Sequence, residues 1–90
     1  MPDIGVVIVT WNAMEVIDAC LASVYADAEG LALQVWVVDN ASSDGTADWV
    51  ADRYPAARLI RNQDNRGFAA ANNQALAQAQ APYLMLLNPD

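Results

Sequence analysis

Four runs of apolar residues in this chain each end in a short polar segment, and three segments with helical periodicity lie between them. The first run is rich in β-branched residues, as expected for a strand that is covered on both faces. Regular alternation of strands and helices is typical of an α/β fold with a parallel sheet and right-handed crossovers. The predicted strands are Ile4 to Val9, Leu33 to Val38, Ala57 to Arg61 and Tyr83 to Leu87.

The three segments between these strands carry helix signals. Apolar residues recur at helical spacing from Met14 to Ala28, and Asn12 is predicted to cap this helix. The second helix is expected from Thr46 to Tyr54, and the third is the alanine-rich stretch from Phe68 to Gln80. We predict an open parallel sheet with the order βαβαβαβ and the strands arranged 3-2-1-4. The fourth strand crosses to the free side of the first, which places the switch point between them.

The composition narrows the function classes. Eleven carboxylates oppose four arginines, and the chain has neither lysine nor histidine. A net charge of −7 argues against a basic surface that binds nucleic acid, but it is compatible with a phosphate-bearing ligand if a divalent metal bridges the two. No apolar run approaches the roughly 18–20 residues of a membrane span. We expect a cytoplasmic protein, with association at the inner face of the membrane only through parts outside this sequence.

Several familiar ligand motifs are absent from the sequence. No GxGxxG follows the first strand, no GxxxxGK[ST] occurs, and there is no GxSxG. Cys20 is the single cysteine, so it cannot form an intramolecular disulfide, and it is predicted to be a small hydrophobic residue on the first helix.

The polar segments that follow the strands occupy the place where an open α/β sheet binds ligands, outside the carboxyl ends of its strands. They are Thr10-Trp11-Asn12, Asp39 to Ser42, Asn62 to Gly67 and Asn88-Pro89-Asp90.

In these segments the chain resembles the N-terminal half of the family 2 glycosyltransferases, inverting enzymes of the GT-A fold that use nucleotide sugars. The resemblance rests on four stretches in order, Val7 to Asn12, Val37 to Thr46, Asn65 to Asn73 and Leu86 to Asp90. Asp39-Asn40 and Asn88-Pro89-Asp90 look most like the rhamnosyltransferase branch. Residues 1–90 are then expected to be the Rossmann-like, nucleotide-sugar-binding part of a GT-A domain, truncated after a DxD-like motif.

The resemblance implies a nucleotide site around the first two strand ends. Asp39 would accept the ring N–H of the base, Thr10 would touch the nucleotide, and the ring of Trp11 would pack along the base. Each residue also has a structural interpretation. Asp39 can cap the following turn, Trp11 can cover the end of the sheet, and Asn12 can cap the helix.

Asn65, Arg66 and Gly67 lie where a loop turns into a helix N-terminus, which favours anions through free N–H groups and the helix dipole. Arg66 can pair with a phosphate or with Asp64. The Asp44-Gly45-Thr46 turn either shapes the loop behind the nucleotide or caps the second helix.

Asn88 and Asp90 occupy the place of the family's DxD signature, which implies Mg²⁺ or Mn²⁺ bound to the diphosphate. Asn88 replaces the first aspartate of that signature, and Asn-Pro-Asp is otherwise an ordinary turn.

The function that follows from the resemblance is sugar transfer with inversion from a UDP-, dTDP- or GDP-sugar to a glycan or lipid-linked acceptor. The general base is expected beyond the end of the chain, so this chain alone is expected to be inactive. The alternative is a non-catalytic nucleotide-binding or interaction module. The last strand would be uncovered, and self-association through it is expected.

Overall fold

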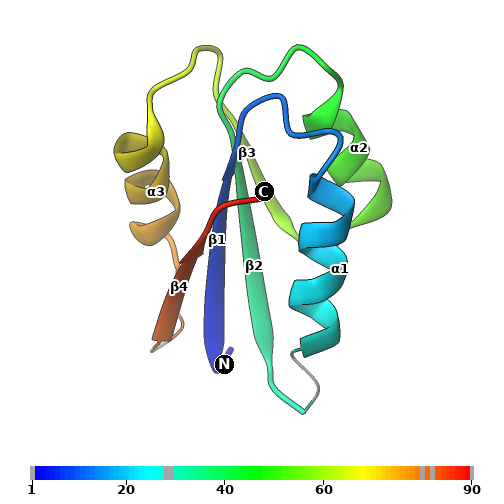
Figure 1. Cartoon of the computed structure of the whole chain (residues 1–90). Helices are drawn as coiled ribbons and strands as arrows, with labels where there is room; N and C mark the ends of the chain where they lie inside the picture. Colours follow the sequence, from blue (N-terminus) through cyan, green and yellow to red (C-terminus); the bar gives the residue numbers. More distant parts are fainter. Residues whose placement is uncertain (1, 28–29, 80, 82, 90) are drawn as a thin grey trace.

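The computed structural model describes residues 2–27, 30–79, 81 and 83–89 (Figure 1). Strands and helices alternate along the chain, which confirms the predicted order. The elements are β1 (Ile4–Thr10), α1 (Ile17–Asp27), β2 (Leu33–Asp39), α2 (Thr46–Arg53), β3 (Arg58–Arg61), α3 (Phe68–Leu76) and β4 (Tyr83–Leu87).

The four strands form one parallel sheet in the order β3-β2-β1-β4, as predicted. The register aligns the carboxyl ends of the first three strands, because Thr10 is opposite Asp39 and Asp39 is opposite Arg61. Leu87 is opposite Ile8, so the polar residues that follow β4 begin beside the last residues of β1. The sheet therefore brings all four polar segments to one edge of the molecule.

Helices cover both faces of the sheet, with α1 and α2 on one side and α3 on the other (Figure 1). Alternate residues of the central strands supply two separate apolar clusters. Val6, Ile8, Val35 and Val37 pack with Ile17 and Leu21 of α1 and with Val50 of α2, and Val7, Val9, Trp36 and Val38 pack with Ala71 and Ala75 of α3. Burial on both faces explains why β1 and β2 read as continuous apolar runs.

The prediction that Asn12 caps the first helix is wrong. Asn12 has a left-handed backbone with φ 50°, and α1 begins only at Ile17. The carbonyl of Ala13 accepts the N–H groups of Val16 and Ile17, so the first helical turn starts after Asn12. The side chain of Asn12 is engaged elsewhere, as described below.

Helix α3 ends at Leu76, four residues before the predicted end at Gln80, which lies outside the described residues. The N–H groups of Gln78 and Ala79 both donate to the carbonyl of Ala75, which closes the helix in a tight turn. Alanine favours a helix but does not fix its end, because the chain must still return to the start of β4.

Cys20 is half-buried on α1 against the first apolar cluster, and burial raises the pKa of its thiol. This agrees with the prediction of a small hydrophobic residue. Of the helices in the described part of the chain, none has the length and apolar character needed to cross a bilayer.

The strand β4 lies at an edge of the sheet and is exposed on both faces. Tyr83, Leu84, Met85 and Leu86 are all exposed, which confirms that the last strand is uncovered in this chain. Gly5 of β1 permits the close approach of β4, because a Cβ atom at this position would lie 2.6 Å from Cδ2 of Leu84.

Candidate functional site

Asp39, at the end of β2, forms a buried hydrogen-bonded group with the end of β1. Its Oδ1 atom accepts the hydroxyl of Thr10 at 2.9 Å and the hydroxyl of Ser42 at 2.6 Å, and its Oδ2 atom accepts the N–H of Ser42 at 3.0 Å. Asp39 is only 3% exposed and Thr10 is fully buried. These contacts match the turn-capping interpretation of Asp39. A carboxylate offers about four acceptor positions, so Oδ2 retains capacity for one more donor.

The loops after β1 and β2 are tied together by Asn12. Its backbone N–H donates to the hydroxyl of Ser42, and its Oδ1 atom accepts the N–H of Ser43, both at 2.8 Å. The left-handed backbone of Asn12 therefore has a cause, since it turns the residue toward the neighbouring loop.

Asp44 joins the beginnings of α1 and α2. Its Oδ2 atom accepts the N–H of Met14 at 3.1 Å, and its Oδ1 atom accepts both the N–H and the hydroxyl of Thr46. The hydrogen bond from the Thr46 hydroxyl is the main reason why the pKa of Asp44 is lowered. The N-cap residue of α2 is Gly45 and has no side-chain cap hydrogen bond, so the predicted capping role of Asp44 is wrong. Its carboxylate instead ties the loop after β1 to the first residue of α2.

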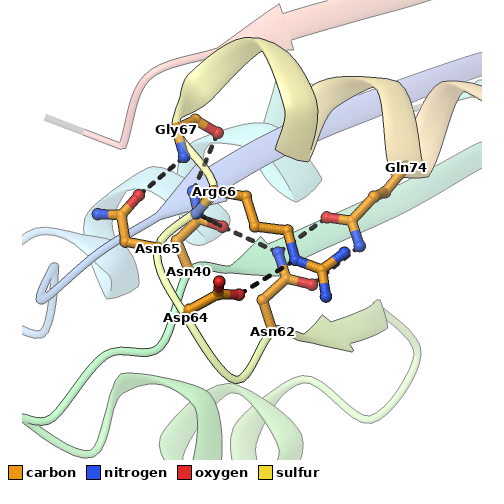
Figure 2. A network of polar contacts seen from close by, with 7 residues as sticks. All are labelled: Asn40, Asn62, Asp64, Asn65, Arg66, Gly67 and Gln74. Atoms are coloured by element: carbon orange, nitrogen blue, oxygen red, sulfur yellow. Dashed lines mark hydrogen bonds and ion pairs between the residues drawn. The ribbon is translucent and has the colours of Figure 1, made fainter.

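A network of side-chain amides joins the end of β2, the end of β3 and helix α3 (Figure 2). Nδ2 of Asn62 donates to Oδ1 of Asn40 and to Oε1 of Gln74, each at 2.8 Å. Nε2 of Gln74 returns a hydrogen bond to Oδ1 of Asn62 at 2.9 Å. Nδ2 of Asn40 donates to the carbonyl of Gly67 at 3.2 Å. The network therefore bridges the two ends of the loop of residues 62–67.

Within this loop, Asn65 and Arg66 have different surroundings. Oδ1 of Asn65 accepts the N–H of Gly67 at 2.9 Å, and Gly67 has φ 83°, a conformation that favours glycine. Nε of Arg66 donates to Asp64 at 3.3 Å, and Figure 2 shows its guanidinium turned toward Asp64 and Gln74. In this structure Arg66 adopts the pairing with Asp64, one of the two roles predicted for it.

The loops after β1 and β2, the start of α3 and the residues after β4 enclose a crevice of about 540 Å³. Trp11 stands at this crevice and is 58% exposed, which is unusual for a tryptophan. The lining residues are Val9, Trp11, Asn12, Ala13, Glu15, Val16, Asn40, Asp44, Asn65, Phe68, Asn88 and Pro89. The structure thus brings residues of all four polar segments to one place. Four predicted site residues are among them, namely Trp11, Asn12, Asn65 and Asn88.

The remaining predicted residues have other positions. Thr10 and Asp39 are buried at the strand ends, and neither they nor Arg66 and Gly67 are among the lining residues. A second groove of about 540 Å³ runs between α1 and β4, with mainly apolar walls that include Cys20, Val24 and Met85. Asn88 and Pro89 line both cavities.

The predicted metal site is only partly described. Asn88 is exposed beside the crevice, whereas Asp90 lies outside the described residues. Among residues 2–27, 30–79, 81 and 83–89, no three His, Cys, Asp or Glu side chains are grouped so that they could hold a metal ion. An amide oxygen suits Mg²⁺ or Mn²⁺ as one ligand, but the described residues do not make a metal centre by themselves.

Four residues of the site were not found by reasoning from the sequence. Asn40, Ser42 and Asn62 belong to polar segments that the sequence does point to, so their positions could have been found. Gln74 carries no such signal, because a glutamine on a helix is ordinary and its partner is 12 residues away.

The sequence profile of the family described as "Glycosyl transferase family 2" matches residues 5–90. Among curated proteins, the chain is 33% identical over 91 residues to the succinoglycan biosynthesis protein ExoO of Rhizobium meliloti, covering all of this chain and 26% of that protein. It is 36% identical over 73 residues to an N-acetylglucosaminyl-diphospho-decaprenol L-rhamnosyltransferase of Mycobacterium tuberculosis, covering 81% of this chain and 24% of that protein.

Among solved structures, the chain is similar to a mannosyltransferase from Pyrobaculum calidifontis in complex with GDP-Man and Mn²⁺. The TM-score is 0.84 at 31% identity, and the match covers 99% of this chain and 28% of that protein. The chain thus spans about a quarter of the length of the curated relatives that it matches.

Proposed function

The chain belongs to glycosyl transferase family 2, and we propose that it binds a nucleotide-sugar donor in the crevice at the carboxyl ends of its strands. The proposed activity is transfer of the sugar, with inversion, to a hydroxyl group of an acceptor. The observation that carries the proposal is the convergence of the four polar segments on one crevice of about 540 Å³. Such a site lies at the switch point of the sheet, between β1 and β4.

The nucleoside is assigned to the ends of β1 and β2. Trp11 is exposed at the crevice, so its ring is free to pack along the base. Oδ2 of Asp39 has capacity for the ring N–H of a uracil, thymine or guanine base. The contacts from Thr10 and Ser42 hold this carboxylate in one orientation before a ligand arrives. Asn12 completes this part of the site as a lining residue.

The diphosphate is assigned to the beginning of α3. No side-chain cap occupies the N-terminus of this helix, and the free N–H groups and the helix dipole there favour an anion. Asn65 lines the crevice, and Gly67 lets the backbone approach a phosphate closely. Arg66 contributes positive charge next to the helix and would exchange Asp64 for a phosphate oxygen.

The cofactor of the proposed reaction is Mg²⁺ or Mn²⁺, held by Asn88, Asp90 and oxygens of the diphosphate. The complex of the Pyrobaculum mannosyltransferase with GDP-Man and Mn²⁺ supports a divalent ion in this family. When bound, such an ion supplies positive charge to the departing diphosphate. With a net charge of −7, the chain itself is poor in groups that could neutralise a diphosphate.

In the proposed reaction the acceptor oxygen forms a bond to the anomeric carbon as the bond to the diphosphate oxygen breaks. The nucleoside diphosphate leaves from the opposite face, and the acceptor proton passes to a general base. We assign no general base within these 90 residues. The mycobacterial relative, named for a diphospho-decaprenol, supports a glycan or lipid-linked acceptor.

The proposed donor site is tested by calorimetric titration of the chain with UDP-, dTDP- and GDP-sugars, with and without Mn²⁺. We expect one base to bind most tightly and Mn²⁺ to strengthen binding. Trp11→Ala should weaken binding about 10-fold or more, because stacking on an aromatic ring contributes roughly 1–3 kcal/mol per base. Trp49→Ala is the matched control, since Trp49 lies on α2 against Tyr54. Absence of binding, or equal losses in the two variants, would favour an interaction module instead.

A further inference from the structure

The side-chain amides of Asn62 and Gln74 face each other and form two reciprocal hydrogen bonds. Each amide donates to the other's oxygen, at 2.8 and 2.9 Å. The pair links the end of β3 to the second turn of α3, two elements that are otherwise connected by the loop of residues 62–67. Figure 2 shows Asn40 between Asn62 and Gly67, which are the two ends of this loop.

Asn40 extends the pair to the N-terminus of α3. It accepts from Nδ2 of Asn62 and donates from its own Nδ2 to the carbonyl of Gly67. That carbonyl also accepts the N–H of Ala71, so it belongs to the first turn of the helix. The three amides thus form one directional series of hydrogen bonds from Gln74 to Gly67. Such a series is strengthened by mutual polarisation in a low-dielectric environment.

The network is buried where it meets the sheet. Asn40 is 2% exposed and Asn62 is 8% exposed, so leaving one of these amides without a partner is costly. The backbone is fixed at the same points, because the N–H of Asn62 donates to the carbonyl of Asp39 and the N–H of Asn40 donates to that of Thr10. Both ends of the loop are therefore held against the end of β2.

Neither Asn62 nor Gln74 lines the crevice, whereas Asn40, Asn65 and Phe68 do. Any influence of the pair on a ligand therefore passes through Asn40, through the loop of residues 62–67 or through the first turn of α3. The amides carry no charge, so their role is geometric.

We propose that Asn62 and Gln74 are positioning residues, which hold the first turn of α3 and the loop of residues 62–67 in the orientation that faces the crevice. This proposal rests on the proposed donor site for its effect on binding. Loss of the pair leaves the ligand-contacting residues unchanged but allows the loop to move, so the bound arrangement must be reached at an entropic cost.

The test compares Gln74→Ala with two controls in the 90-residue chain. Gln78→Ala removes an exposed glutamine four residues further along, and Val50→Ala destabilises the opposite face of the sheet through a fully buried residue. Binding of uridine, thymidine and guanosine diphosphates is measured by calorimetry, and amide hydrogen exchange is measured at residues 63–70. We expect Gln74→Ala to accelerate exchange in this segment and to weaken binding about 3- to 10-fold. Gln78→Ala should change neither, and Val50→Ala should lower stability while leaving the dissociation constant unchanged.

Unchanged exchange and unchanged affinity in Gln74→Ala would overturn the proposal, as would a loss of affinity that Val50→Ala reproduces at equal stability. If the unaltered chain binds none of the three diphosphates, the proposed function fails. The exchange rates then still decide whether the pair holds the loop.

Discussion

The ends of β1, β2 and β3 differ from the end of β4 in how their side chains are held. At the ends of β1, β2 and β3, the hydroxyl of Thr10 donates to Asp39, and Nδ2 of Asn62 donates to Asn40, the next residue along the chain. Between described residues, no side-chain hydrogen bond joins β4 or Asn88 to the rest of the molecule, and β4 exposes apolar side chains on both faces. The ends of β1, β2 and β3 are thus fixed by hydrogen bonds without a ligand, whereas the end of β4 is not. In the proposed function, the nucleoside would occupy the hydrogen-bonded part of the region.

The largest contrast is expected in the free energy of unfolding, between substitutions in β1 and substitutions in β4. Ile8→Ala in the buried strand β1 should lower the free energy of unfolding by about 2–5 kcal/mol, because it leaves a cavity between packed side chains. Leu86→Ala in β4 should cost about 1 kcal/mol or less, since Leu86 is 46% exposed. Urea unfolding measures both, and equal losses would show that β4 is as well packed as β1.

At the ends of β1, β2 and β3, substitution of Asp39 should have the next largest effect on the free energy of unfolding. Asp39→Ala leaves the fully buried hydroxyl of Thr10 and the N–H of Ser42 without their acceptor, which should cost about 2–3 kcal/mol of unfolding free energy. It should also weaken the binding of uracil, thymine and guanine nucleotides in a titration, because each of these bases loses the acceptor of its ring N–H. Asp52→Ala, an exposed aspartate on α2, provides the control. A stable Asp39→Ala variant would mean that this carboxylate does not organise the strand ends.

Asp44 tests whether the loops depend on a shared hydrogen-bond acceptor. Asp44→Ala should lower the unfolding free energy by about 1 kcal/mol, since the N–H groups of Met14 and Thr46 both lose their acceptor. The pKa of Asp44 is lowered from its ordinary value of 3.8, so its contribution is present above that value and is lost as the pH falls through the lowered pKa. Unfolding curves from pH 7 down to acid should show a smaller loss in the variant than in the unaltered chain.

The smallest effect on stability is expected in the exposed edge strand β4. Met85→Glu places a charge on an exposed edge strand and should change the unfolding free energy by only about 0.5 kcal/mol. It should nevertheless reduce self-association, because an uncharged apolar edge invites pairing with another copy. Sedimentation velocity over a range of concentrations measures this. Ala22→Glu, which adds the same charge on α1, should leave association unchanged, and an equal reduction would point to net charge alone.

The order and topology of the elements could be predicted because the determining signals are local. Two continuous apolar runs mark the strands that are buried on both faces, and Arg58 and Arg61 mark β3 as an edge. The polar segments at the strand ends located the crevice for the same reason. Where an element ends depends on what it meets, and so the end of α3 and the start of α1 were misplaced.

The contacts between loops could not be predicted in this way. Asparagine is a common helix cap, but the side chain of Asn12 accepts a hydrogen bond from Ser43, which is 31 residues away. Gln74 pairs with Asn62 only because α3 crosses the sheet beside the end of β3. A local pattern cannot distinguish an amide that caps its own helix from one that joins two loops, because both use the same donor and acceptor atoms.

The most direct test of the nucleotide site is a map of amide chemical shifts during titration of the ¹⁵N-labelled chain with UDP-, dTDP- and GDP-sugars in the presence of Mg²⁺. The shifts induced by the base that binds should cluster at residues 10–12, 39–42 and 65–68, around the crevice that these segments share. Shifts confined to the groove between α1 and β4, at Cys20, Val24 and Met85, would contradict a nucleotide site at the strand ends, as would no shift with any of the three donors.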